Sequence, residues 1–351
     1  MREKLILVLP TRSTFMRMDF DLLAEEFAVT EVNLEQDRSR IAYLKGIFRA
    51  LKVIRKSRDC RRILVWFADY HAAPVALLSR FLKKSCYVFI GGYDAVCYPE
   101  LSYGVYFSRF RGSCARLALK NCACIIANHV ALLSSLNTYY EPQGHTDGVY
   151  KMIPGLGTPG IVIHNAIAAA PPSDLTSQRD RQVLTVGSTP RLQDFYNKGF
   201  DLLAAVAKRR PDLKFVFAGI RDSWRAELNR LFQLDKLENL TVLPGLPHAE
   251  MLDLMRRSAV YAQPSISEGM PNALMEAMLM GCVPVGSNVA GIPTVIGEHG
   301  FVIAKRDDQL LESALDQALA AEPDRRAISD SITDRFNWEI RQEKLLRLLL
   351  A

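Results

Sequence analysis

The sequence lacks any long hydrophobic run, although 49% of its 351 residues are hydrophobic and 23% are charged. No apolar stretch approaches the ~18 residues that a bilayer-spanning helix needs. The five apolar residues Leu5–Leu9 are fewer than the ~7–15 of a signal-peptide core, and they predict a first buried strand. This balance excludes a disordered chain, a collagen-like fibre and a disulfide-dense miniprotein. We expect a soluble, cytoplasmic protein of about two domains.

Signatures of a structural zinc site or of nucleic-acid binding are also missing. The chain has seven cysteines, but Cys122 and Cys124 are separated by one residue, which is closer than the pairs in structural zinc sites. We expect these thiols to be buried and reduced. No zinc-finger, RRM or helix-turn-helix pattern occurs, so nucleic acid is not expected as a partner.

The net charge of +6 is concentrated in the first half of the chain. Residues 1–165 carry 22 Lys and Arg against 14 Asp and Glu, whereas the remainder carries 22 against 24. Segment 38–62 is strongly basic and also contains apolar residues at helical spacing: Ile41, Leu44, Ile47, Phe48, Leu51 and Ile54. Segment 103–120 mixes basic with aromatic residues. A solvated helix face explains one basic segment equally well, but the two together fit an anionic membrane surface or an anionic lipid carrier.

Short apolar runs alternate with helical patterns along the whole chain, which is typical of parallel sheets built from βαβ units. The predicted strands are Leu5–Leu9, Ile63–Phe67, Tyr87–Ile90, Cys124–Ala127, Val183–Val186, Lys214–Ala218, Leu240–Leu243, Val260–Gln263 and Val283–Val285. A segment rich in Gly, Pro and Ala, 155–172, is the candidate linker. We therefore predict an α/β protein with two Rossmann-like domains that face a cleft.

The segment 264–285 carries the densest pattern: strand end, loop, short helix, glycine stop and strand. Pro271 suits the first helical turn and Gly281 the C-terminal cap. Glu268 lies in the loop, and Glu276 lies about five residues into the helix with its side chain leaning back toward the helix start. Because the loop follows the carboxyl end of a strand, both carboxylates can accept hydrogen bonds from hydroxyl groups of one ligand. A surface helix explains Glu276 alone, but not the whole pattern.

This pattern resembles that of the retaining GT-B glycosyltransferases of family 4, the glycosyl transferases group 1. The resemblance rests on Glu268 and Glu276 with Gly269, Pro271, Ala277, Gly281 and Pro284 around them, and it extends to other segments of the second half. Gly187 and the Asn197-Lys198-Gly199 turn look like the family's phosphate loop. The resemblance implies an acceptor-binding domain at 1–165, joined by a terminal helix at 337–351 that crosses back, and a donor-binding domain at 166–336.

The family's activity is the transfer of a sugar from a nucleotide diphosphate donor to an acceptor hydroxyl, in cell-surface polysaccharide or glycolipid biosynthesis. The resemblance implies that Glu268 holds the hydroxyls of the sugar, that Glu276 holds the ribose, and that Lys198 neutralises the leaving diphosphate. It also implies donor contacts from Gly187, Leu246, Gly269, Met270, Pro271 and Asn272. The basic and aromatic segments of the first half favour a saccharide or a lipid-linked saccharide as acceptor, reached by a cytoplasmic or peripheral enzyme at the inner face of the membrane.

The sequence departs from the family at several positions. Ser188 follows Gly187 where relatives carry Arg, so Arg191 is the candidate substitute. Where many relatives carry a His, this chain has Gly91-Gly92-Tyr-Asp94, and Asp94 is predicted to act near the reacting carbon. The candidates on the acceptor side are Asp69, His71, Gly91 and Gly92.

One further motif, Asp19-Phe-Asp21, matches the metal-binding motif of the other glycosyltransferase fold. It precedes a helical pattern, so we predict that it caps a helix, and we expect neither an obligatory metal nor a cofactor. Two other functions remain open from the residues. One is a sugar-nucleotide epimerase of the same architecture, and the other is a catalytically silent subunit of a glycan-assembly complex.

Overall fold

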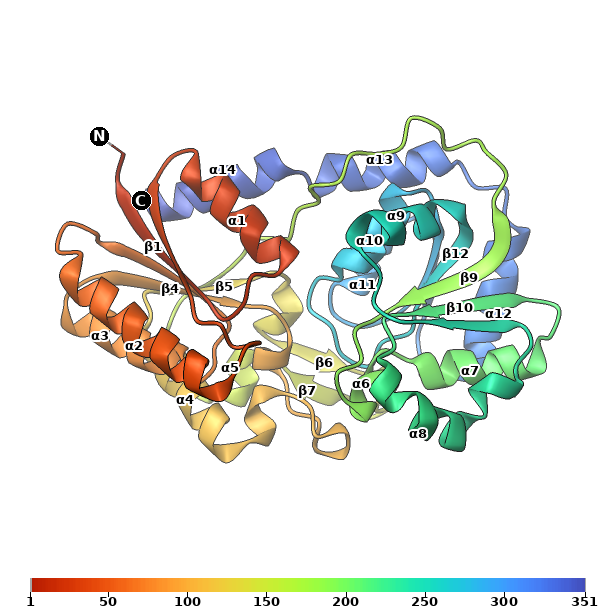
Figure 1. The fold of residues 1–351 in the computed structure, drawn as a ribbon, viewed down its shortest axis with the longest axis horizontal. Helices are drawn as coiled ribbons and strands as arrows, with labels where there is room; N and C mark the ends of the chain where they lie inside the picture. Colours follow the sequence, from red (N-terminus) through yellow and green to blue (C-terminus); the bar gives the residue numbers. More distant parts are fainter. Residues whose placement is uncertain (1, 351) are drawn as a thin grey trace. The chain divides into compact units, whose positions relative to one another are not determined.

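The computed structural model describes residues 2–350, and the chain divides into two compact units. Unit 1 comprises Met1–Ser135, Thr146–Ala168 and Trp338–Ala351. Unit 2 comprises Leu136–His145 and Ala169–Asn337. Each unit has its own parallel sheet with helices on both faces (Figure 1).

Unit 1 is built on a six-stranded sheet whose strand pairs are all parallel, in the order β2-β1-β3-β4-β5-β8. Its strands are β1 (Lys4–Leu9), β2 (Ala28–Asn33), β3 (Arg62–Trp66), β4 (Ser85–Ile90), β5 (Cys124–Ala127) and β8 (Gly160–Val162). Its helices are α1 (Thr14–Ala24), α2 (Arg40–Lys56), α3 (Ala72–Phe81), α4 (Arg109–Asn121), α5 (Val149–Met152) and α14 (Trp338–Leu350). In Figure 1, α1 and α14 cover one face of the sheet, and α2, α3 and α4 cover the other.

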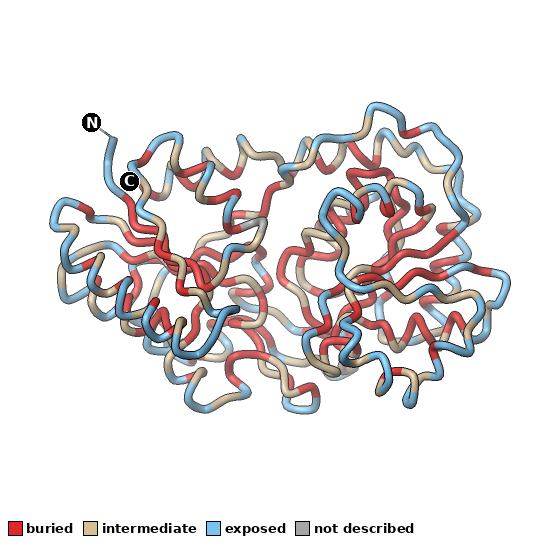
Figure 2. Tube along the Cα trace, in the orientation of Figure 1, coloured by how far each residue is buried: buried red, intermediate tan, exposed pale blue. Residues whose placement is uncertain are grey.

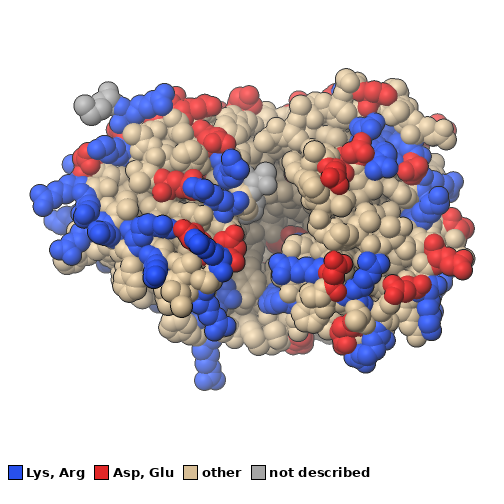
Figure 3. Space-filling view, in the orientation of Figure 1, with Lys and Arg blue, Asp and Glu red and all other residues tan. Residues whose placement is uncertain are grey.

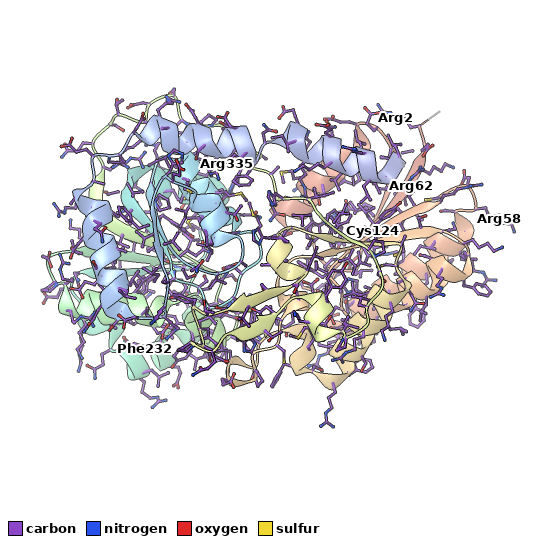
Figure 4. All side chains as sticks on the ribbon, turned by 180° about the vertical axis from the view of Figure 1, so that it is seen from behind. Arg2, Arg58, Arg62, Cys124, Phe232 and Arg335 are labelled. Carbon is purple, nitrogen blue, oxygen red and sulfur yellow. The ribbon has the colours of Figure 1, made fainter. Side chains whose placement is uncertain are left out.

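The terminal helix α14 belongs to unit 1, as the sequence predicts for the helix that crosses back. Leu345 and Leu349 are buried in one hydrophobic cluster with alternate residues of β1. Arg62, labelled in Figure 4, donates a hydrogen bond to the carbonyl of Leu349. The helix therefore closes the core of this unit although it lies at the other end of the sequence.

Asp19 is buried inside α1 and forms an ion pair with Arg341 of α14, in which Arg341 Nε lies 2.7 Å from Asp19 Oδ1. The indole nitrogen of Trp66 also donates to this carboxylate, at 3.0 Å. The prediction that Asp19 caps a helix is therefore wrong, because α1 begins five residues earlier, at Thr14. Buried charges need partners, and this pair links the two ends of the chain.

Unit 2 has a second six-stranded sheet, again with parallel pairs throughout, in the order β11-β10-β9-β12-β13-β14. Its strands are β9 (Asp180–Val186), β10 (Lys214–Ala218), β11 (Leu240–Leu243), β12 (Ser258–Gln263), β13 (Val283–Ser287) and β14 (Phe301–Ile303). Its helices are α6 (Leu192–Asn197), α7 (Phe200–Arg209), α8 (Asp222–Phe232), α9 (His248–Arg257), α10 (Asn272–Leu279), α11 (Ile292–Ile296), α12 (Asp308–Ala320) and α13 (Arg325–Arg335).

One hairpin differs from the predicted domain division. Strands β6 (Ser135–Asn137) and β7 (His145–Asp147) pair with each other. Residues Leu136–His145, which include parts of both strands and the turn that joins them, group with unit 2. The predicted division assigned all of 1–165 to the first domain. Inside the predicted linker 155–172, the strand-like run Ile161–Ile163 falls largely in β8, at the edge of the first sheet.

Figure 2 shows that the strands of both units are largely buried, whereas exposed residues concentrate on helix surfaces and connecting loops. All seven cysteines are free thiols, and burial raises the pKa of Cys282 to about 11 and keeps it protonated. Within residues 2–350, no helix combines the length and the apolar character needed to cross a membrane.

Candidate functional site

The strand order of unit 2 places its candidate site. Counted within the unit, the order is 3-2-1-4-5-6, and the direction of the winding reverses between the neighbouring strands β9 and β12. Open α/β sheets bind ligands outside the carboxyl ends of the strands at this switch point. Gly187 directly follows β9, and Glu268 lies in the loop that follows β12. Two of the residues singled out in the sequence therefore lie at the same edge of the sheet.

A glycine turn brings Lys198 to this loop. Lys198 directly follows α6, and Gly199, with φ of +75°, directly precedes α7. A Cβ on Gly199 would lie 2.3 Å from the carbonyl oxygen of Pro264, so only glycine permits this approach. A Cβ on Gly187 would in turn lie 3.0 Å from Cγ of Lys198. The turn is thus packed between the ends of β9 and β12.

The Glu268 carboxylate is only 12% exposed and accepts three hydrogen bonds from side chains. Lys198 Nζ forms an ion pair with it, Gln263 Nε2 donates at 2.9 Å, and Ser265 Oγ donates at 3.2 Å. Gln263 and Ser265 are absent from the sequence prediction. The available signal was a polar Gln263 at the end of the otherwise apolar strand β12.

The backbone of the loop before Glu268 is held by four buried side chains. Consecutive carbonyl groups from residue 264 to residue 267 each accept one hydrogen bond: Pro264 from Tyr139 Oη at 3.2 Å, Ser265 from Ser287 Oγ at 2.7 Å, Ile266 from Asn137 Nδ2 at 2.8 Å, and Ser267 from Asn197 Nδ2 at 3.4 Å. Two of these donors belong to the hairpin of residues 136–145. The loop is therefore fixed along its length, and the position of Glu268 is fixed with it.

Helix α10 starts at Asn272, and Pro271 lies at its N-cap rather than inside the first turn. Gly281 has φ of +81° just past the helix, as a C-terminal glycine stop requires. Glu276 Oε1 lies 2.9 Å from Nε2 of His248, the first residue of α9. Sequence reasoning missed His248, because only the fold brings the starts of α9 and α10 together.

Glu268 and Glu276 both influence the ionisation of the buried Tyr261 hydroxyl. Burial, Glu268 and Glu276 together raise the pKa of Tyr261, which lies in β12. Gly269, Met270 and Pro271 are buried between β12 and α10, and the Gly269 carbonyl accepts a hydrogen bond from the Gly291 backbone at 2.9 Å. The structure therefore gathers these predicted residues around a single loop.

Two other predicted donor residues lie further along the same unit. Arg191 directly precedes α6, and its guanidinium pairs with Asp194 at 2.7 Å, so any phosphate contact has to compete with that pair. Leu246 lines a cavity of about 450 Å³ beside α9, together with Leu243, Ala249, Glu250, Asp253, Leu254 and Arg257. The roles of Arg191 and Leu246 as donor contacts remain proposals.

In unit 1, Asp94 holds two loops together. Its buried carboxylate accepts backbone N–H groups from Ala68 at 2.9 Å, Gly91 at 2.9 Å and Gly92 at 3.1 Å. Burial raises the pKa of Asp94 to about 6, although these bonds act in the opposite direction. Because the carboxylate is committed to backbone amides that follow β3 and β4, the geometry argues against a catalytic role for Asp94 and explains why Gly91 and Gly92 surround it.

Asp69 lies beside this loop and pairs with Arg111 of α4, whose Nε donates to it at 3.0 Å. The Arg111 guanidinium also lies over the ring of Tyr93, 4.9 Å from its centroid. His71 does not fit its predicted place on the acceptor side. Both of its ring nitrogens make internal hydrogen bonds, to the Tyr43 hydroxyl and the Trp66 carbonyl, and burial lowers its pKa.

Metal-ligating side chains do not cluster in the part of the chain that the structure describes, where no three His, Cys, Asp or Glu residues are arranged to hold an ion. The positive charge beside Glu268 comes from Lys198 instead. Helix starts and lysines both favour phosphate groups.

Solved structures share the architecture over the full chain. Sucrose-phosphate synthase from Thermosynechococcus elongatus has a TM-score of 0.73 and 14% sequence identity, with 99% of this chain and 98% of that chain covered. Anabaena HepE, in complex with UDP and glucose, has a TM-score of 0.66 and 16% identity, with 98% and 99% covered. The protein therefore has the GT-B fold, as the resemblance in its sequence implies.

A family model gives the second half a more specific assignment. Residues 176–335 match the model described as glycosyl transferases group 1. The chain thus carries a glycosyl transferases group 1 domain, and that domain contains Lys198, Glu268 and Glu276.

A curated relative from Schizosaccharomyces pombe is the phosphatidylinositol N-acetylglucosaminyltransferase gpi3 subunit. It is 29% identical over 187 residues, which cover 52% of this chain. The match covers 39% of the length of that relative, so most of the relative lies outside it.

Proposed function

We propose that the protein is a retaining glycosyltransferase of family 4, a hexosyltransferase that moves a sugar from a nucleotide diphosphate donor to a hydroxyl group of a glycolipid acceptor. The observation that carries the proposal is the pairing of Lys198 with Glu268 on a fixed loop at the switch point of the second sheet. A carboxylate that can accept sugar hydroxyls and a cation that can meet a diphosphate are adjacent there.

The reaction needs charge stabilisation where the donor breaks. As the bond between the anomeric carbon and the diphosphate oxygen lengthens, negative charge grows on the phosphate, and Lys198 stabilises it. Glu268 orients the sugar through its hydroxyls, and Glu276 holds the ribose. The acceptor oxygen attacks from the face that the diphosphate leaves, and the departing phosphate oxygen takes its proton. This account requires no metal, because Lys198 supplies the positive charge.

The relatives support the choice of partners. HepE was solved with UDP and glucose, and the fission-yeast relative is named for transfer of N-acetylglucosamine to phosphatidylinositol. A UDP-sugar, with UDP-N-acetylglucosamine as the first candidate, and a lipid-linked acceptor are therefore the proposed substrates. A peripheral position at the inner face of the membrane follows from such an acceptor.

Thermal unfolding with a panel of sugar nucleotides tests the donor site. A bound donor at 100 times its Kd adds about 2.7 kcal/mol to the free energy of unfolding. We expect stabilisation by one nucleotide diphosphate sugar, and a smaller stabilisation of the Glu268→Gln variant by the same donor. The proposal fails if no sugar nucleotide stabilises the folded wild-type protein.

Product analysis separates transfer from the other functions. In the presence of a lipid-linked acceptor, NMR of the product is expected to show the anomeric configuration of the donor, and addition of EDTA is expected to leave the rate unchanged. An epimerised sugar nucleotide without transfer would identify an epimerase instead. Donor binding without any turnover would identify a silent subunit.

A further inference from the structure

The charged residues of the layer formed by α2, α3 and α4 are all basic. Helix α2 carries six Lys or Arg residues, α3 carries one and α4 carries four, and none of the residues described in these three helices is Asp or Glu. By contrast, α1 and α14 on the other face of the same sheet contain both acidic and basic residues. Figure 3 shows Lys and Arg side chains gathered over the part of unit 1 where α2 runs in Figure 1.

Helix α2 buries a stripe that includes Gly46 and Ala50 and leaves large apolar residues exposed. The sequence pattern suggested an apolar arc from Ile41 to Ile54, but only Ile54 of that arc is buried. The buried stripe is Tyr43, Gly46, Ala50 and Ile54. A Cβ on Gly46 would lie 2.6 Å from the carbonyl oxygen of Leu34, so the helix is pressed against the loop after β2.

The other two helices repeat this arrangement. Large apolar side chains stand exposed on all three: Ile41, Leu44 and Phe48 on α2, Leu77 and Phe81 on α3, and Phe110 and Leu117 on α4. The most exposed of them are Phe48 at 71%, Phe81 at 82% and Phe110 at 71%, one on each helix. Helix α3 packs against both α2 and α4, so the three phenylalanines belong to one continuous layer.

A basic recess lies at one end of this layer. It has a volume of about 350 Å³ and is lined by Arg80, Lys83, Lys84, Ser85, Lys120, Asn121, Cys122 and Ala123. Phe81 lies next to Arg80 in the sequence. Exposed apolar and cationic side chains thus occur on the same three helices, and we name their exposed residues the basic-apolar face.

We propose that the basic-apolar face docks on an anionic phospholipid bilayer, with Phe48, Phe81 and Phe110 entering the interface and the surrounding Lys and Arg side chains meeting lipid phosphates. A bilayer offers negative charge and apolar volume over one extended plane, and the face presents a complement to both. Nucleic acid would satisfy the cations but leave the phenylalanines in water. A second copy of the chain would bring two positive faces together.

This inference deepens the proposed function, since a lipid-linked acceptor is met at such a surface, but it does not depend on the transfer reaction. Arg111 is set apart from the face because it is held by Asp69. The docking groups are therefore distinct from the residues around Glu268, and each set can be changed without the other.

Flotation of the full-length protein with vesicles tests the proposal. We expect binding to vesicles in which about one lipid in three is phosphatidylglycerol, weaker binding to phosphatidylcholine alone, and a loss of about tenfold at high salt. The variant Phe48→Ser/Phe81→Ser/Phe110→Ser is expected to lose at least tenfold in affinity for the anionic vesicles. The variant Lys45→Gln/Lys52→Gln/Lys56→Gln is expected to lose affinity and part of the salt dependence.

Matched controls come from unit 2. The variant Leu231→Ser/Val302→Ser/Leu310→Ser removes exposed apolar residues of that unit, and Lys208→Gln/Lys214→Gln/Lys236→Gln removes three of its exposed charges. Both controls are expected to bind vesicles as the wild type does. Thermal unfolding of all four variants shows whether each remains folded.

Several outcomes would overturn the proposal. They are failure of the folded wild-type protein to bind anionic vesicles, equal loss of binding in the control variants, or full binding by the phenylalanine variant. Concentration-dependent dimerisation abolished by the same phenylalanine changes would assign the face to a second copy instead. The Glu268→Gln variant is expected to float as the wild type does, so a failure of the transfer chemistry leaves this result readable.

Discussion

The loops at the carboxyl ends of the two sheets use their carboxylates in opposite ways. In unit 2, Glu268 is held by the side chains of Lys198, Gln263 and Ser265, which a ligand can replace or share. In unit 1, Asp94 is held by three backbone N–H groups, which cannot leave without unfolding the loop. An acid bound by side chains is suited to a ligand, whereas an acid bound by the backbone is suited to the fold.

The surroundings of the two carboxylates extend this contrast. The unit 2 loop lies within the segment that matches the glycosyl transferases group 1 model, and it keeps the residues that the resemblance predicts. The unit 1 loop departs from the family, and its nearby Asp69 is already paired with Arg111. The proposed donor chemistry therefore uses side chains of unit 2, whereas the carboxylates of unit 1 are committed to internal contacts.

The largest effect is expected from the Lys198–Glu268 pair. Lys198→Met and Glu268→Gln should each lower kcat by about 10²–10³-fold, because each removes a group that stabilises the transition state. The double variant should lose much less than the product of the two single losses, since the two groups act together. Steady-state kinetics of the four proteins measure this, and fully additive losses would show that the pair does not work as a unit.

A large effect on stability, with little effect on activity, is expected from Asp94→Asn. In the folded protein the pKa of Asp94 is about 6, above its ordinary value of 3.8. Between these values the folded state retains a proton that the unfolded chain has lost, so the free energy of unfolding falls as pH rises from 4 to 6. Loss of this proton lowers the free energy of unfolding by roughly 2–3 kcal/mol.

Urea unfolding of the wild type and of Asp94→Asn at pH 4.5 and 7.5 isolates this contribution. Relative to Asp94→Asn, the free energy of unfolding of the wild type should be lower at pH 7.5 than at pH 4.5 by roughly 2–3 kcal/mol. Transfer activity at pH 7.5 should stay within about threefold. An activity loss like that of Glu268→Gln in a folded variant would restore Asp94 as a catalytic residue.

An intermediate effect is expected from the four side chains that hold residues 264–267. Tyr139→Phe removes the hydrogen bond to Pro264 and should cost about 1 kcal/mol of stability. It should also lower kcat several-fold with little change in the donor KM, because the loop that positions Glu268 loosens. Tyr150→Phe is the matched control, since its hydroxyl donates to the Thr158 carbonyl in unit 1. Equal effects on kcat in both variants would remove the positioning role.

The smallest effect is expected from His248. His248→Ala removes the 2.9 Å contact between His248 Nε2 and Glu276 Oε1. The His248 side chain is half-exposed, so the contact is partly screened by water. A bond of this kind is worth under about 1 kcal/mol, so the donor Kd should rise about threefold. Calorimetry with the donor measures the change, and His248→Gln should recover part of it. An unchanged Kd would show that Glu276 is positioned without this partner.

The sequence predicts the strands and the Glu268 loop because their signals are local. The predicted strand at Ile63–Phe67 lies one residue from the observed β3, and the βαβ alternation alone indicates two Rossmann-like sheets. Strand β2 escaped the prediction, because an edge strand of alternating exposure lacks a continuous apolar run. The resemblance adds that Lys198 and the Glu268 loop serve one donor, and the structure pairs the two residues although they are 70 residues apart.

Features that depend on distant partners escape such reasoning. Asp19 in α1 looks like a cap until its partner Arg341 is known, 322 residues away. A carboxylate at position 94 looks catalytic until three amides from neighbouring loops are seen to hold it. The sequence identifies the type of a residue, but contacts that form only in the fold determine whether its side chain is available to a ligand.

The hairpin of residues 136–145 bears on how the protein can be recombined. Because it groups with unit 2, the chain passes between the units four times, and unit 2 is not one continuous stretch of sequence. A chimaera with residues 1–168 from a relative and the rest from this chain would therefore pack a foreign hairpin against the loop of residues 264–267. Exchange of donor specificity between relatives should succeed only when both segments are transplanted together.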